Sequence, residues 1–271
     1  MTLRIGALFG AAAICAACLS GTVAAQDIKP GELVTQGKLT YGVTPAFQPF
    51  EFLNGDTIVG FDVEMAALLA AKLGLEAEPL SMAFDGLLPA LQGNRIDIIN
   101  SGMYINEKRL EQADLIPYLR VGQEIVVRAG NPKGIQSRDD VCGTRIGVST
   151  GTIQELNAKA DVARCAEAGR EAVEVLTFPP GGSVVALRQG RIDVYYIATP
   201  TAVVLVAEHP EAFEIAGETF EANTLLGIGV DKSKAELKTA VETALAEIRE
   251  DGSLMEVAKK YGIPASSLSG F

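Results

Sequence analysis

Apolar and polar residues alternate along this chain with two different periods. Residues 39–43 and 145–148 form short apolar runs typical of strands, whereas apolar positions over 62–73 recur at the spacing of a helix face. Strand and helix signals then take turns over most of the sequence. This order predicts an α/β fold with parallel sheets.

Local signals place individual elements. Asp62 is suited to cap the helix over 62–73, which ends before a glycine. Asp85 is suited to cap a second helix over 86–92, and we expect a buried strand over 96–100 to follow.

The same plan occurs twice. Residues 145–148 repeat the character of 39–44, and 183–196 repeat the helix, glycine, Arg-Ile-Asp and strand order of 87–100. The length of the chain favours two α/β lobes over a single lobe that contains two copies of one local motif.

The first 25 residues are typical of an export signal. Arg4 precedes an apolar segment over 5–19, which is short for a membrane span. We therefore predict a signal peptide that is cleaved after Ala25. Lipidation at Cys18 is the minor alternative, because Cys15 stands where a bulky aliphatic residue is expected.

Charge and cysteine content exclude several classes of partner. The net charge of −11 argues against nucleic acid and anionic membranes. Cys142 and Cys165, which remain after cleavage, most simply form a disulfide in an exported protein. The one histidine, His209, is expected in a surface loop. We expect no metal site and no cofactor.

The segment 94–120 carries the strongest functional signal. Asn106 is suited to cap a helix that has Arg109 in its first turn, where a cation opposes the helix dipole. An anion held beside this helix end would explain the arginine. The alternative is a solvated Arg109 that pairs with Glu107 or Glu111.

This segment also resembles the polar amino-acid group (family 3) of bacterial solute-binding proteins, the receptors of ATP-driven (ABC) importers. The resemblance rests on its Arg-Ile-Asp, Ser-Gly-Met-x-Ile-x-x-x-Arg and Pro-Tyr elements. Further matches follow in order over most of 38–262, at residues 42–50, 60–64, 84–91, 147–152, 189–193 and 251–253.

The resemblance implies a two-lobe periplasmic binding protein fold of type II, with the ligand in the cleft between the lobes. Lobe 1 would comprise 26–120 and 221–271, and lobe 2 would comprise 121–220, with chain crossings near 119–123 and 217–222. C-terminal amphipathic helices over 236–248 and 254–261 would pack on lobe 1. The protein would be a periplasmic monomer that docks on a membrane permease.

Turns at the carboxyl ends of the strands predict the site. By resemblance, Phe47 and Phe84 sandwich the ligand, Arg109 clamps its carboxylate and Thr152 donates from lobe 2. The remaining candidates on these turns are Thr44, Ser101, Gly102, Tyr104, Ser149 and Ile153. Core packing is the alternative for the two phenylalanines. We assign Phe50 and Phe61 to the core, and structural roles to Asp97 and Asp193.

Two positions depart from the family pattern. Tyr104 stands where relatives have a small hydroxyl residue, and Ala198 stands where relatives have the aspartate that accepts the ligand's ammonium group. Because an unpaired ammonium is costly to bury, we predict a ligand whose amine is N-substituted, quaternary or absent. A carboxylate from Glu51 or Asp85 would overturn that prediction.

An exported dehydratase of prephenate-like acids on the same fold is the alternative to a receptor. Such an enzyme needs an acid or base in the cleft, and Glu155 or Glu51 are the candidates. No nucleophile–base pair accompanies either residue in the sequence, which favours the receptor.

Overall fold

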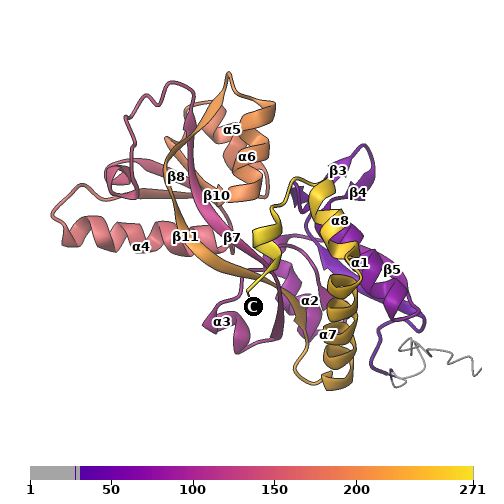
Figure 1. Ribbon diagram of the computed structural model, residues 1–271. Helices are drawn as coiled ribbons and strands as arrows, with labels where there is room; N and C mark the ends of the chain where they lie inside the picture. The colour runs from indigo at the N-terminus through magenta and orange to yellow at the C-terminus, as the bar shows by residue number, and fades with distance from the viewer. Residues whose placement is uncertain (1–27, 29–30, 271) are drawn as a thin grey trace, which may run out of the picture.

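The computed structural model describes residue 28 and residues 31–270, so the predicted signal peptide lies outside the described residues. Within this part of the chain, none of the helices combines the length and the apolar character that crossing a membrane requires. Figure 1 shows two lobes that are joined by the long strands β7 and β11. The alternation of strands and helices that the sequence predicts is confirmed.

The elements of lobe 1 are the strands of one part of a shared sheet, a small second sheet and the helices around them. They are β1 (Lys38–Val43), β2 (Ala46–Phe47), β3 (Glu51–Asn54), β4 (Thr57–Val59), α1 (Phe61–Lys72), β5 (Glu76–Ser81), the 3-10 helix η2 (Phe84–Gly86), α2 (Leu87–Gln92), β6 (Ile98–Ile99), α3 (Glu107–Leu110), α7 (Ala235–Glu250), α8 (Ser253–Lys260) and η4 (Ala265–Leu268).

Lobe 2 repeats this plan with fewer elements. They are η3 (Arg138–Val141), β8 (Arg145–Ser149), α4 (Ile153–Glu167), β9 (Glu174–Phe178), α5 (Gly182–Arg188), β10 (Val194–Ala198) and α6 (Thr199–Glu208). The connecting strands are β7 (Asp114–Arg128) and β11 (Phe213–Val230).

One eight-stranded sheet runs through both lobes in the order β5-β1-β6-β11-β7-β10-β8-β9, and β2, β3 and β4 form a small second sheet. The outer strand pairs are parallel, as predicted. The prediction of parallel sheets is wrong in the middle, where β11 pairs antiparallel with both β7 and β6, and β10 with β7. The chain leaves lobe 1 along β7 and returns along β11, so these neighbours run in opposite directions.

The ladder between β7 and β11 is interrupted where the chain passes between the lobes. Its register shifts between Ala216 and Phe220, between Phe220 and Thr224, and again after Leu226. Such irregularities bend strands and remove ladder hydrogen bonds. The predicted crossings near 119–123 and 217–222 fall on these strands, and the exact lobe boundaries stay a prediction.

The predicted caps have mixed outcomes. Asn106 caps α3, because its side chain accepts a hydrogen bond from the Arg109 N–H at 3.0 Å. The prediction for Asp62 is wrong, because α1 begins at Phe61 after Gly60. Gly60 has φ 137°, and a Cβ there would lie 2.1 Å from the Phe50 carbonyl oxygen, so only glycine fits this turn.

Asp85 does not act as a side-chain cap either. The chain enters this helix through the 3-10 turn η2, which supplies the change of direction before α2 begins at Leu87. No side-chain cap bond is formed at the start of α2.

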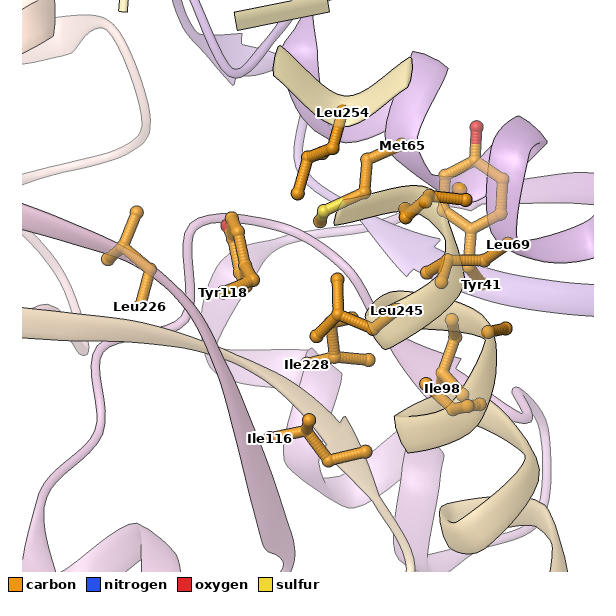
Figure 2. Close-up of a cluster of buried hydrophobic side chains, with 14 of the residues drawn as sticks. Tyr41, Met65, Leu69, Ile98, Ile116, Tyr118, Leu226, Ile228, Leu245 and Leu254 are labelled. Carbon is orange, nitrogen blue, oxygen red and sulfur yellow. The ribbon is translucent and has the colours of Figure 1, made fainter. Parts of the chain in front are cut away.

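The main core lies between the sheet and three helices of lobe 1. Figure 2 shows Met65 and Leu69 of α1 close to Leu245 of α7 and Leu254 of α8, over the sheet residue Tyr41. The predicted packing of the C-terminal helices on lobe 1 is therefore confirmed. Phe50 and Phe61 are completely buried, as predicted.

Both aspartates with predicted structural roles bind backbone groups at strand starts. Asp97 accepts hydrogen bonds from the N–H groups of Val34 and Thr40, each at 2.7 Å. Asp193 accepts from the backbone and the guanidinium of Arg145, with Nη2 at 2.9 Å from Oδ1.

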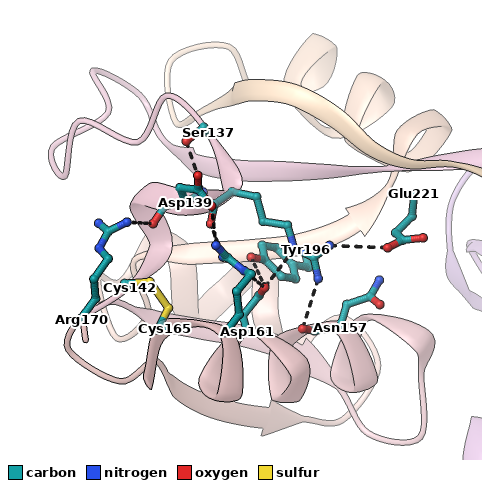
Figure 3. Close-up of polar contacts among 11 residues, drawn as sticks. Ser137, Asp139, Cys142, Asn157, Asp161, Cys165, Arg170, Tyr196 and Glu221 are labelled. Atoms are coloured by element: carbon teal, nitrogen blue, oxygen red, sulfur yellow. Dashed lines mark hydrogen bonds and ion pairs between the residues drawn. A yellow bond between two sulfur atoms is a disulfide. The ribbon is translucent and has the colours of Figure 1, made fainter. Parts of the chain in front are cut away.

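Lobe 2 is held together by a disulfide and a buried charge cluster, which Figure 3 shows side by side. The predicted pair Cys142–Cys165 is confirmed, and it joins the end of η3 to α4. Next to it, Asp161 accepts hydrogen bonds from Arg138, Arg164 and the Tyr196 hydroxyl. Three donors compensate the burial of this carboxylate.

Removal of the disulfide is expected to destabilise lobe 2 without altering the cleft. Cys165 lies about 18 Å along α4 from the helix end that faces lobe 1. The double substitution Cys142→Ser, Cys165→Ser should lower the free energy of unfolding by about 3 kcal/mol, because it releases a loop constraint on the unfolded chain. Chemical denaturation measures this loss. Reactive thiols in the unfolded, unreduced wild-type protein would contradict the pairing.

Candidate functional site

A small cavity of about 60 Å³ lies between the two lobes. Its wall in lobe 1 consists of Thr44, Ala46, Phe47, Glu51, Phe84, Gly102 and Tyr104. Its wall in lobe 2 consists of Ser149, Thr152, Gln154, Pro180, Tyr195, Tyr196 and Ile197. Most of the predicted site residues therefore meet at one place, and their roles in binding stay predictions.

The Ser101–Gly102 turn forms the base of the lobe 1 wall. The Ser101 hydroxyl accepts from the Thr44 N–H at 2.9 Å and donates to Glu51 Oε1 at 2.8 Å, so this predicted contact residue is buried behind the wall. Gly102 has φ 50°, and a Cβ there would lie 2.6 Å from the ring of Phe47. The turn therefore requires glycine and holds Phe47 against it.

Two buried carboxyl groups lie behind this turn. Asp62 Oδ2 accepts hydrogen bonds from the Gly102 N–H at 2.7 Å and from the Tyr118 hydroxyl at 2.8 Å. Glu51 Oε2 and Asp62 Oδ1 receive no donor from other groups. The nearby charge of Asp62 disfavours ionisation of Glu51, and a proton on one carboxyl group would allow that group to donate to the other.

Burial shifts the pKa values of both carboxyl groups upward. Burial, together with the charge of Asp62, raises the pKa of Glu51 well above its ordinary value. Burial also raises the pKa of Asp62, to about 6, although the donors on Gly102 and Tyr118 favour its carboxylate. Both shifts favour a pair that retains a proton, and Glu51 is the member whose charge is opposed by its neighbour.

Arg109 is buried at the junction of the lobes. Its Nη1 donates to the Tyr104 carbonyl at 2.7 Å and its Nη2 to the Gly151 carbonyl of lobe 2 at 2.8 Å. The guanidinium carbon lies 5.3 Å from the centre of the Phe84 ring. The alternative of a solvated Arg109 that pairs with Glu107 or Glu111 is wrong.

The charge of Arg109 has no acidic partner in the part of the chain that the structure describes. Burial lowers the pKa of Arg109 to about 10, so the guanidinium stays charged at neutral pH. Arg109 does not line the small cavity. It lines an adjacent cavity of about 350 Å³, together with Phe84, Asp85 and Thr152.

The lobe 2 wall is built on the start of α4. The Thr152 side chain caps the helix by accepting from the Glu155 N–H at 3.3 Å, and its hydroxyl donates to the Ser149 carbonyl at 2.7 Å. The free backbone N–H groups at the start of a helix attract anions. The side chain of Ile153 packs at the edge of the lobe 1 core, and the predicted contact of its backbone with the ligand stays a prediction.

Sequence reasoning missed Gln154. Its Nε2 donates to the Tyr104 hydroxyl of lobe 1 at 2.9 Å and to Gln123 Oε1 of β7 at 2.7 Å. Tyr104, the departure noted above, thus reaches lobe 2 with its hydroxyl. Burial raises the pKa of Tyr104 to about 12, so this hydroxyl is neutral. The one signal for this role in the sequence was the polar character of Gln154 in the first turn of a helix.

Ala198 lies beside the cavity but does not line it. It is completely buried at the start of α6, while the preceding residues Tyr195, Tyr196 and Ile197 form the wall. Ile197 is not among the contacts that the sequence predicts. In the described part of the chain, no group of His, Cys, Asp and Glu side chains is arranged to hold a metal ion.

The sequence profile of the bacterial extracellular solute-binding proteins, family 3, matches residues 39–264. The chain belongs to this family. It is 31% identical over 229 residues to the L-cystine-binding protein TcyJ of Escherichia coli, covering 83% of each chain. It is 28% identical to a probable histidine-binding protein of Campylobacter jejuni, covering 82% of this chain and 84% of that protein.

Solved structures agree with the two-lobe fold. An ancestral arginine-binding protein bound to arginine superimposes with a TM-score of 0.77 at 35% identity, over 83% of this chain and 98% of that chain. The L-arginine-bound protein AbpA of Streptococcus pneumoniae gives a TM-score of 0.75 at 27% identity, over 87% and 98% of the two chains. The predicted periplasmic binding protein fold is confirmed.

The contact between Tyr104 and Gln154 is expected to stabilise the closed arrangement. The substitution Tyr104→Phe removes the hydroxyl that joins the lobes, and a neutral hydrogen bond of this kind contributes about 0.5–1.5 kcal/mol. The open form should become more populated, which increases the radius of gyration of the ligand-free protein in small-angle X-ray scattering. An unchanged scattering profile would show that this hydrogen bond does not hold the lobes together.

Proposed function

We propose that this receptor binds a small amino acid or N-modified amino-acid derivative through its carboxylate group, by closure of the two lobes. The buried guanidinium of Arg109 carries the proposal, because it is desolvated beside the cavity without an acidic partner in the described residues. A ligand carboxylate would neutralise it through the planar donor fork that suits this anion. Its other contacts would come from the start of α4.

Contacts across the cleft support the closure mechanism. Arg109 with Gly151, and Tyr104 with Gln154, join the lobes only when these approach each other. A ligand that binds this arrangement more tightly than an open one shifts the population toward it. The interrupted ladder between β7 and β11 is the region that we assign to the hinge.

The relatives suggest where and with what the protein works. Proteins named for binding cystine, histidine and arginine make these amino acids the first candidates for its ligand. We further propose that the chain is exported after cleavage at Ala25, acts as a monomer and delivers its ligand to the permease of an ABC importer.

The enzyme alternative has little support at either candidate acid. Glu155 is paired with Lys159 at 2.6 Å. Burial alone would raise the pKa of Glu155, but hydrogen bonds from Lys159 and the Gly151 N–H hold it below its ordinary value. Glu51 Oε1 accepts a hydrogen bond from the Ser101 hydroxyl, and the charge of the neighbouring Asp62 disfavours the carboxylate form of Glu51. Turnover of a prephenate-like acid by the purified protein would overturn the receptor proposal.

A thermal-shift screen of amino acids, N-substituted amino acids, betaines and simple organic acids tests the ligand class. A ligand at 100 times its dissociation constant stabilises the folded protein by about 2.7 kcal/mol, which raises the melting temperature measurably. We expect stabilisation by at least one carboxylate solute. A complete absence of stabilisation by carboxylates would contradict the proposal.

Arg109→Ala is expected to abolish this stabilisation and leave the fold intact. Loss of one side of a buried guanidinium–carboxylate pair costs about 2–5 kcal/mol of binding free energy. Arg188→Ala is a matched control, because Arg188 also lies 5.3 Å from a phenylalanine ring, that of Phe213 in lobe 2, but outside the cavity. The control should bind normally. Normal binding by Arg109→Ala would refute the assigned role.

A further inference from the structure

We propose that the Glu51–Asp62 pair, whose buried Oε2 and Oδ1 atoms receive no donor from the described residues, is the anionic subsite of the cavity, that it shares one proton in the ligand-free protein, and that a cationic group of the ligand displaces this proton on binding. The inference rests on the proposed function and names the second charged group that the ligand carries. It assigns to the pair the role that the alanine at position 198 cannot fill.

The position of Glu51 is the first support. Among the described residues that line the small cavity, Glu51 is the one acidic side chain, and it is 1% exposed. The other candidate from the sequence, Asp85, lines the larger adjacent cavity instead. Glu51 lies by the Gly102 turn and Phe47, whereas Arg109 lies by Phe84. Glu51 therefore lines the small cavity and Arg109 the adjacent one, and the two cavities share Phe84 and Thr152, so one ligand that extends between them would meet both charges.

The uncompensated charge of the pair is the second support. The main influences on the pKa values of Glu51 and Asp62 are burial, their mutual interaction and hydrogen bonds from neutral groups, with no lysine or arginine among them. The groups that surround them include Tyr41 on β1 and Tyr118 on β7, whose pKa values are raised by burial first and then by these carboxyl charges. A buried anion without a cation is unfavourable until a ligand supplies one.

Neutralisation by a ligand changes the proton balance of the site. A cation in the cavity stabilises the carboxylate form of Glu51, so its Oε–H bond breaks and the proton passes to the solvent buffer. The ligand gains an ion pair, and the pair Glu51–Asp62 then holds two negative charges against the ligand's positive charge. Up to one proton is released for each ligand bound, and no other reactant is needed.

The variant Glu51→Gln tests the proposal sharply, because it imitates the protonated acid. Its amide oxygen can accept from Ser101 as Glu51 does, and its amide N–H can donate to Asp62. If Glu51 were only a neutral structural group, this variant would bind every ligand normally. We expect the variant to fold normally and to bind cationic ligands more weakly than the wild type does, by a factor of about thirty or more.

Isothermal titration calorimetry supplies the readout that a structural role would not change. L-arginine, L-histidine and L-cystine are each titrated beside their Nα-acetyl derivatives, which keep the carboxylate but remove the α-ammonium charge. The enthalpy is measured in two buffers with different enthalpies of ionisation. We expect the free amino acid that binds to release protons in the wild type and none in Glu51→Gln.

The pair is also tested without any ligand. The infrared spectrum of the wild-type protein at neutral pH should contain the carbonyl band of a buried protonated carboxyl, and Glu51→Gln should lack it. If this band is absent from the wild type, the inference is overturned. A second variant, Asp62→Asn, should lower the pKa at which the band of Glu51 disappears, since it removes the neighbouring charge.

The outcomes separate the inference from the function on which it rests. Binding of the acetylated compounds or betaines, with all the free amino acids inert, would overturn the anionic subsite but leave the carboxylate receptor standing. Equal affinity of wild type and Glu51→Gln for a free amino acid would do the same. Failure of every carboxylate solute to bind would overturn the proposed function and the inference together.

Discussion

Burial of charge without a protein partner is the constraint on which this structure depends. Arg109 and the Glu51–Asp62 pair are both removed from water at the junction of the lobes, and neither has an opposite charge in the described part of the chain. Each is stabilised by neutral groups only, carbonyls for the cation, and hydroxyl and amide donors for the anion. Burial of such charges is unfavourable, and in the proposed function a complementary ligand would remove this free-energy cost.

The long strands make this cost reversible. The strands β7 and β11 carry the chain between the lobes, and their ladder loses its regular register over Ala216–Thr224. Regular pairing continues on either side of the interruption, which is why we assign the hinge to it. Opening there would break the bond of Arg109 to the Gly151 carbonyl and expose the guanidinium to water, and closing would desolvate it again. In the proposed mechanism, ligand charge and lobe position are linked through these groups.

The sequence predicted the fold well because its elements are local. The Asn106 cap and the C-terminal helices follow from short sequence patterns, and the disulfide follows from the cellular compartment. The failures involve groups whose role depends on distant neighbours. Asp62 is of a residue type that often caps helices, but its hydrogen-bond partners Gly102 and Tyr118 lie 40 and 56 residues away in the sequence. The contacts of Gln154 and the antiparallel pairing of β11 were not predicted either, because no local pattern in the sequence encodes contacts between distant segments.

The Ser101–Gly102 turn shows why folding and recognition are inseparable here. Gly102 must be glycine because its φ is positive and because Phe47 covers it. The hydroxyl of Ser101 and the N–H of Gly102 then each bind one member of the acidic pair. The geometry that places the phenylalanine at the cavity therefore also positions the acidic pair. A change in the turn would disturb the aromatic wall and the hydrogen bonds of both carboxyl groups together, so the aromatic and acidic parts of the proposed site depend on one structural unit.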